Sequence, residues 1–242
     1  MIDLLGDTGG PPVSLRETCR VVEGGIPLWR WHRARLEAGG CSESMLICAE
    51  LTAFPLAGEY EDARPGQRVR LSLSVGTDGE AAASVSRELS SLDVVGGPVC
   101  VRVDVDGAPE LPPGAAKPLD RSFWDDAQRV AYAADAHQAV LVGPDGLVID
   151  GGTATVWTVE GGVLVTPPAP PAIAGVARAW LLERAGAAGL RAEVEPMPWE
   201  RFEAADEALL TNAFGGAVAV RGRGGPVCER VVAEFDRLWR EG

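Results

Sequence analysis

The chain has 242 residues, of which 46% are hydrophobic and 24% are charged, and this is the composition of a globular protein with a hydrophobic core. Its net charge of −13 argues against binding to nucleic acid or to an anionic membrane, because both need clustered cations. No stretch of the sequence approaches the ~18 consecutive apolar residues that a membrane-spanning helix requires.

The first half of the chain predicts a mixed α/β unit. Apolar residues that recur every three or four positions favour helices, and strict alternation favours strands. Ser42 is placed as the N-cap of the second helix. The expected elements are a strand at 14–22, helices at 27–38 and 42–54, and strands at 68–75, 80–89 and 98–106.

Residues 107–116, GAPELPPGAA, are rich in Pro, Gly and Ala and have no periodicity, so they are interpreted as a linker. The linker divides the chain into a first lobe, 1–106, and a second lobe, 117–242. In the second lobe Ser122 and Asp125 fit a capping box, which predicts a helix from Phe123 to Ala136. The elements expected after it are strands at 138–142, 146–150, 153–159 and 162–168, a helix from 176, a strand at 190–197, a short helix at 199–206, strands at 207–213 and 216–220, and a helix at 228–241.

The cysteines and histidines narrow the chemistry. Five cysteines are scattered without a CxxC pair, and there are only two histidines, so neither a disulfide framework nor a metal site is expected. The first residues, MIDLLGDTGGPP, lack the basic and apolar regions of a secretory signal. Together these features predict a cytoplasmic protein.

Lys117 is the only lysine among 22 basic residues. One explanation is compositional drift from Lys to Arg, which would leave a single lysine with no meaning. The other is chemical: arginine replaces lysine as a cation, but its guanidinium does not deprotonate and cannot serve as an amine nucleophile. Lys117 is therefore a candidate Schiff-base residue, most naturally for pyridoxal phosphate. Pro118 favours an extended backbone at this position.

A pyridoxal phosphate enzyme also needs a phosphate site and an acid near the pyridine nitrogen. Gly175 precedes a predicted helix that begins at Val176 and Ala177, and the free N–H groups of a helix N-terminus bind phosphate. An arginine could add donors. Candidates for these roles are Arg33 or Arg35 in HRARL, the turn at Asn212 and Ala213, and Asp150 at the end of GLVID; taken singly, Gly175 and Asp150 are more often ordinary turn residues.

The order of these motifs resembles the fold-type IV pyridoxal phosphate enzymes, the class IV aminotransferases, and especially aminodeoxychorismate lyase. The resemblance runs from about Leu15 to Val220 and rests on HRARL, KPLDR, DGLVIDGGTATVW, AGVAR and EALLTNA. It implies a two-lobed α+β (α/β) fold like that of D-amino-acid aminotransferase, with an N-terminal α/β sandwich and a C-terminal pseudo-barrel. It also implies a homodimer that acts on a small-molecule amine.

The resemblance implies a role for each site residue. Lys117 would form the Schiff base, Arg35 would hold the phosphate, and Asp150 would lie beside the pyridine nitrogen, where the family usually has Glu. The remaining cradle would come from the backbone of Val176 and Ala177 and from the turn at Asn212 and Ala213. Arg121, four residues after Lys117, is similar to the lyase branch.

Several positions depart from the family pattern. Thr155 and Trp157 stand where Asn and Phe are common, and Val75 stands where relatives often carry an Arg for a substrate carboxylate. The N-terminal segment also lacks the D-R-G-F and G-D-G signatures. Three functions therefore stay open: a lyase that releases pyruvate and 4-aminobenzoate, an aminotransferase of branched-chain or D-amino acids, and a degenerate relative without the cofactor.

Overall fold

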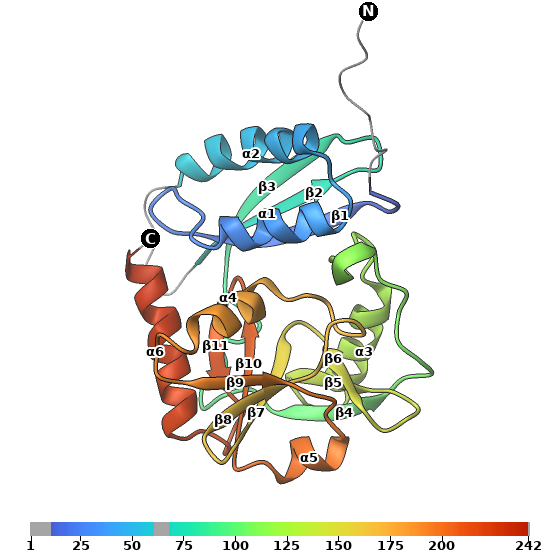
Figure 1. The fold of residues 1–242 in the computed structure, drawn as a ribbon, viewed down its shortest axis with the longest axis vertical. Helices are drawn as coiled ribbons and strands as arrows, with labels where there is room; N and C mark the ends of the chain where they lie inside the picture. The colour runs from blue at the N-terminus through green and yellow to red at the C-terminus, as the bar shows by residue number, and fades with distance from the viewer. Residues whose placement is uncertain (1–10, 61–67, 242) are drawn as a thin grey trace, which may run out of the picture.

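The computed structural model describes residues 11–60 and 68–241, and Figure 1 shows two stacked lobes. Residues 1–10, which carry most of the segment used to predict that there is no secretory signal, lie outside the described residues. No helix in the described part of the chain is long and apolar enough to cross a membrane. The mixed helix and sheet architecture expected from the sequence is confirmed.

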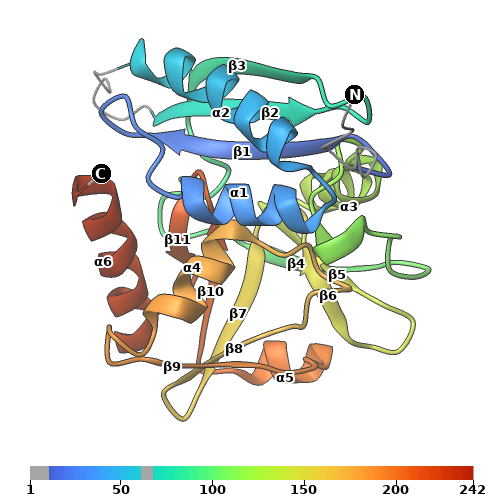
Figure 2. The ribbon, with the colours of Figure 1, turned by 45° about the horizontal axis from the view of Figure 1, so that its top comes forward.

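The first lobe is an antiparallel sheet with two helices on one face (Figure 2). Alternate residues of the first strand, such as Leu15 and Cys19, are buried beneath the helices, because successive side chains of a strand point to opposite faces. The opposite face of the sheet is therefore directed at the second lobe. The elements are β1 (Leu15–Val21), α1 (Trp29–Ala38), α2 (Glu43–Gly58), β2 (Arg68–Val75) and β3 (Ala81–Glu88), in the sheet order β1-β2-β3.

Helix α2 begins where the sequence predicts and ends later. The Ser42 hydroxyl accepts a hydrogen bond from the Met45 N–H, so Ser42 is the N-cap. The predicted end at Phe54 is wrong, because the helix continues through Pro55 to Gly58. A proline in the last turn removes only one backbone hydrogen bond, and packing of the buried Ala57 favours the extra turn.

The second lobe contains two sheets, of order β11-β10-β7-β8-β9 and β4-β5-β6. Val140, Val156 and Leu210, from three different strands, meet in one core that both sheets share. Helix α6 packs against β10 and β11, and α4 lies beneath α1 of the first lobe (Figure 1). The elements are β4 (Cys100–Asp104), η1 (Pro113–Ala115), α3 (Ser122–Ala133), β5 (Gln138–Val142), β6 (Val148–Gly151), β7 (Thr155–Glu160), β8 (Val163–Thr166), α4 (Val176–Arg184), β9 (Arg191–Val194), α5 (Trp199–Ala204), β10 (Glu207–Asn212), β11 (Gly216–Ala219) and α6 (Pro226–Glu241).

Strand β4 pairs in parallel with β5, in the second lobe, although it falls within the 1–106 segment assigned to the first lobe. Alternation predicts a strand but does not say which sheet it joins. We therefore propose that the first lobe ends after β3 and that residues 107–116 are a connection within the second lobe.

The segment around Lys117 joins the two lobes. The Arg16 N–H donates to the Lys117 carbonyl at 3.0 Å, and Leu119 N–H donates to the Ser14 carbonyl at 2.7 Å. Pro118 forms an isolated bridge with Leu15, so the segment is extended, as the proline predicts. This pairing fixes Lys117 beside the first residues of β1.

The predicted capping box of α3 is wrong. The helix begins at Ser122 itself, and the Asp120 carboxylate accepts a hydrogen bond from the Ser122 N–H at 2.9 Å. Asp125 pairs with Arg121 instead, which draws the carboxylate away from the capping position. The helix ends at Ala133, before the predicted Ala136, because the chain turns through Asp135 at a φ of 54°.

Candidate active site

Two adjoining cavities carry the predicted site residues. The larger has a volume of about 470 Å³ and the smaller about 70 Å³, and they share Lys117, Arg121, Thr153 and Asn212. The structure brings together every site residue that the sequence predicts, although they come from both lobes. The smaller cavity is lined, among others, by Arg35, Lys117, Asp150, Val176, Ala177, Asn212 and Ala213.

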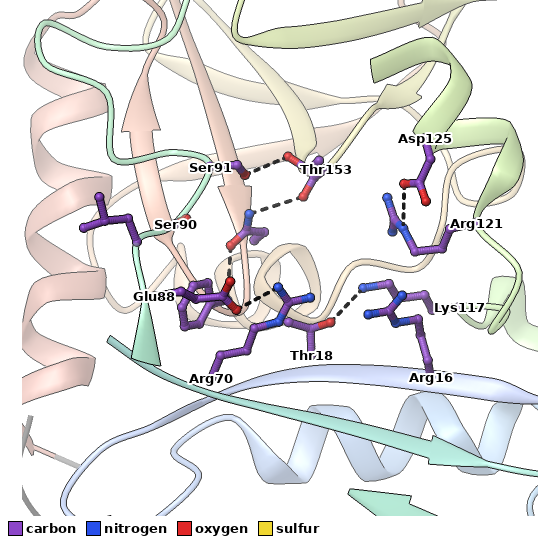
Figure 3. Close-up of a pocket in the computed structure, with 13 residues that line it drawn as sticks. Arg16, Thr18, Arg70, Glu88, Ser90, Ser91, Lys117, Arg121, Asp125 and Thr153 are labelled. Atoms are coloured by element: carbon purple, nitrogen blue, oxygen red, sulfur yellow. Dashed lines mark hydrogen bonds and ion pairs between the residues drawn. The ribbon is translucent and has the colours of Figure 1, made fainter. Parts of the chain in front are cut away.

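Lys117 is half-buried, and its amine donates a hydrogen bond to the Thr18 hydroxyl at 3.2 Å (Figure 3). Burial, and then the charges of Arg121 and Arg35, lower the pKa of Lys117 well below its usual value, while Glu17 acts in the opposite direction. A larger fraction of the amine is therefore neutral at neutral pH. A neutral amine has the lone pair that a nucleophile or a general base needs.

Arg35 reaches the smaller cavity from α1 and is held by a buried carboxylate. Glu17 accepts hydrogen bonds from the Arg35 Nε at 2.8 Å and from its Nη2, and it also pairs with His32 Nδ1 at 2.5 Å. Arg35 Nη1 donates to the Ala174 carbonyl of the second lobe at 3.0 Å. The alternative candidate, Arg33, lies away from the cavities and pairs with surface glutamates of the first lobe.

The start of α4 forms an anion-binding corner of the smaller cavity. Its N-cap, Gly175, has no side-chain cap, so the first N–H groups, those of Val176 and Ala177, have no partner within the helix. A Cβ on Gly175 would lie 2.5 Å from the Thr155 hydroxyl, so only glycine allows this close approach. Phosphate is the kind of ligand that such a corner binds.

The turn after β10 also lines the smaller cavity, but the Asn212 side chain is used locally. Its Oδ1 accepts the N–H groups of Phe214 and Gly215, and its Nδ2 donates to the Thr153 carbonyl at 3.2 Å. Asn212 thus shapes the turn that presents Ala213 to the cavity.

Asp150 is 5% exposed and lies in β6, one residue before the end of the strand. Its two oxygens accept the backbone N–H groups of Gly151 at 2.9 Å and Ile173 at 3.1 Å. Burial raises the pKa of Asp150 to about 7, and these two hydrogen bonds, followed by Arg121 and Arg178, only partly oppose the rise. Asp150 can therefore hold a proton at neutral pH, or lose it to pair with a cationic ring nitrogen.

The raised pKa predicts that Asp150 makes the cofactor-free protein less stable at high pH. A folded-state pKa of about 7, above an unfolded value of 3.8, means that stability falls as pH rises through this interval. Between pH 5.5 and 8 the wild-type protein should lose about 2 kcal/mol more than Asp150→Asn, as measured by urea unfolding. The quantity compared is the change in the free energy of unfolding with pH, and not its value at one pH. The asparagine also alters the hydrogen bonds from Gly151 and Ile173, which shifts the stability at every pH. Equal pH dependence in the two proteins would contradict the assignment.

The residues fit pyridoxal phosphate in its three chemical requirements. Lys117 would provide an amine for the aldehyde, Arg35 and the α4 N-terminus would provide donors for the phosphate, and Asp150 would provide an acid for the pyridine nitrogen. The buried Trp124 Nε1 also lines this cavity and has no hydrogen-bond partner among the described residues. Within the described residues no cluster of three His, Cys, Asp or Glu side chains could hold a metal ion.

The departures from the family pattern lie in different environments. Thr155 lines the smaller cavity. Trp157 is fully buried in the core, where its Nε1 donates to the Thr211 hydroxyl at 2.9 Å. Val75 is also fully buried, so this position gives no group to a substrate.

The larger cavity contains residues that the sequence analysis missed. Arg16 and Thr18 from β1, Arg70 from β2 and Glu88 at the end of β3 project into it from the first lobe (Figure 3). Alternation along β1 could have placed Arg16 and Thr18 on one face. No pattern in the sequence indicates that this face is turned towards Lys117.

Comparisons with known proteins identify the family of the chain. Residues 14–222 match the family model described as amino-transferase class IV. A segment of 120 residues is 27% identical to the branched-chain-amino-acid aminotransferase of Pseudomonas aeruginosa, and it covers 46% of this chain but only 39% of that relative.

Solved structures share the fold at low sequence identity. A hypothetical aminotransferase from Mycobacterium tuberculosis in its PLP-bound form matches with a TM-score of 0.78 at 20% identity, over 95% of this chain and 89% of that one. A putative 4-amino-4-deoxychorismate lyase from Legionella pneumophila matches with a TM-score of 0.71 at 18% identity, over 97% and 98% of the two chains. Because the family model spans most of the sequence, the chain belongs to the class IV aminotransferase family, and its cofactor is pyridoxal 5′-phosphate.

Proposed function

We propose that the protein is a pyridoxal phosphate-dependent lyase similar to 4-amino-4-deoxychorismate lyase, which releases pyruvate and forms 4-aminobenzoate. The observation that carries this proposal is the lining of the larger cavity. Arg16, Arg70 and Arg121 line it together with Lys117, and Leu89 and Phe214 are its only apolar side chains among the described residues. A substrate with one carboxylate on its ring and another on its enolpyruvyl group suits such a cavity.

The geometry of the two cavities supports the following proposed roles for the chain's own residues. When bound, pyridoxal phosphate supplies an aldehyde that condenses with amines and a ring that accepts electrons. Arg35 and the N–H groups of Val176 and Ala177 would bind its phosphate, and Asp150 would pair with its ring nitrogen. The Lys117 amine takes a proton from the substrate ring and returns one to the departing enolpyruvyl group, which leaves as pyruvate.

A direct assay tests the lyase. The purified holoenzyme is incubated with 4-amino-4-deoxychorismate, and pyruvate and 4-aminobenzoate are quantified. We expect the two products in equal amounts. Absence of pyruvate above the level of a Lys117→Ala control would reject the lyase.

The second candidate is an aminotransferase of branched-chain or D-amino acids, which the curated relative from Pseudomonas aeruginosa favours. A branched aliphatic side chain needs an apolar pocket, and the charged lining of the larger cavity argues against it. Stoichiometric formation of a 2-oxo acid from an amino acid, with conversion of the cofactor to its amine form, would support this candidate over the lyase.

We also propose a homodimer located in the cytoplasm. The homodimer rests on the resemblance to the family. The location rests on the scattered, unpaired cysteines, which suit a reducing compartment.

A further inference from the structure

Arg16 differs from the other arginines of the larger cavity because its side chain has no hydrogen-bond or ion-pair partner among the residues that the structure describes. Arg70 pairs with Glu88 at 2.9 Å, and Arg121 pairs with Asp125 at 3.4 Å. The half-buried Arg16 guanidinium makes no hydrogen bond or ion pair with any residue in the described part of the chain. A cation removed from water without a counter-ion is unfavourable, so the site is suited to an anion supplied from outside the chain.

The charges around Arg16 also favour a bound anion. Burial, followed by the charges of Arg121 and Arg70, lowers the pKa of Arg16, and Asp125 is the group that opposes them. Three guanidinium groups thus meet around one cavity in a chain of net charge −13. A bound anion would offset their mutual repulsion.

Arg16 and Lys117 are held in fixed register. The Arg16 N–H donates to the Lys117 carbonyl at 3.0 Å, and Thr18, two residues along the same face of β1, binds the Lys117 amine at 3.2 Å. Figure 3 shows the Arg16 side chain beside Lys117. An anion on the Arg16 guanidinium therefore lies in the same cavity as the reactive amine.

We propose that Arg16 binds a carboxylate of the substrate and so determines which amines are accepted at Lys117. The planar guanidinium can donate two parallel hydrogen bonds to a carboxylate, which fixes orientation as well as charge. The inference rests on the proposed function only in assuming an amine substrate with a carboxylate. That assumption holds for the lyase and for the aminotransferase alike.

A matched pair of probes tests Arg16 without turnover. 4-Aminobenzoate and 4-aminobenzamide have nearly the same shape and differ in one carboxylate charge. Each is titrated calorimetrically into the holoenzyme of the wild type, Arg16→Gln, Arg16→Lys and the control Arg191→Gln. Arg191 is a suitable control because it is a 76% exposed arginine on strand β9 and does not line either cavity.

We expect the wild type and Arg191→Gln to bind the carboxylate at least about tenfold more tightly than the amide, the usual size of a charge-assisted hydrogen bond. Arg16→Gln should reduce this preference to less than about threefold, and Arg16→Lys should retain part of it. Arg16→Lys also provides a test if the glutamine variant does not fold. The proposal would be overturned if both Arg16 variants preferred the carboxylate over the amide as strongly as the wild type does. It would also be overturned if the wild type showed no such preference.

The outcomes separate this inference from the lyase proposal. No pyruvate in the lyase assay, together with a preference that depends on Arg16, rejects the lyase and retains the role of Arg16. Pyruvate formation with a preference independent of Arg16 retains the lyase and rejects the role of Arg16.

Discussion

Replacing Lys117 by arginine is expected to abolish covalent attachment of the cofactor and to lower turnover by at least about a thousandfold. Arginine keeps the positive charge and the capacity to donate to Thr18. It does not provide a neutral nitrogen near neutral pH, because its pKa lies above about 12. The substitution therefore separates amine chemistry from charge.

The measurement is reduction of the holoenzyme with borohydride, followed by peptide mass analysis. Because Lys117 is the only lysine, the wild type offers a single side-chain amine for the adduct. Lys117→Ala is the control for side-chain size, and both variants should lack the adduct while keeping the fold. An adduct or full activity in Lys117→Arg would disprove the assignment. A wild-type protein without any adduct would instead favour the degenerate relative.

The sequence indicated which residues line the smaller cavity, but not the contacts that bring them together. Lys117 could be identified because chemistry excludes arginine from its role, and Asp150 because the order of motifs resembles one family. Arg16 could not be identified, since alternation tells which residues share a face but not what that face meets. The pairing of β4 with β5 and the hydrogen bond from the Ser122 N–H to Asp120 at the start of α3 likewise depend on contacts that no local pattern encodes.

Glu17 was also missed, although the sequence contained a signal. It alternates with Leu15, Cys19 and Val21 on the buried face of β1, where an acid needs a partner. The partners, His32 and Arg35, lie three residues apart in HRARL and so face the same side of α1. A buried acid facing a helix with two basic residues could have been recognised as an ion-pair network.

Glu17 holds Arg35 in this network, so a substitution of Glu17 tests whether Arg35 belongs to the phosphate site. Burial alone would raise the pKa of Glu17, but Arg35 and then His32 outweigh it and lower the pKa to about 2. Burial lowers the pKa of His32 more than Glu17 raises it, so His32 is neutral near pH 7 and Arg35 is the paired cation.

Glu17→Gln is therefore expected to destabilise the protein by about 3–5 kcal/mol, because it leaves the Arg35 charge buried without a counter-ion. For a chain of this size the melting temperature should fall by roughly 6–20 °C. Arg35 would also lose the contacts that aim it at the α4 N-terminus, so the holoenzyme should bind its cofactor at least about tenfold more weakly.

Glu43→Gln is the matched control, since Glu43 also pairs with an arginine of α1, Arg33, but is 67% exposed. It should unfold at nearly the same denaturant concentration as the wild type. The pH dependence gives a second check. Because the folded pKa of Glu17 lies below the unfolded value of 4.5, its contribution is present above pH 4.5 and is lost as pH falls towards 2. The difference in the free energy of unfolding between the wild type and Glu17→Gln should therefore become smaller as the pH falls from 4.5 towards 2. If Glu17→Gln were as stable as Glu43→Gln at pH 7, Glu17 would not be the counter-ion that holds Arg35 in the site.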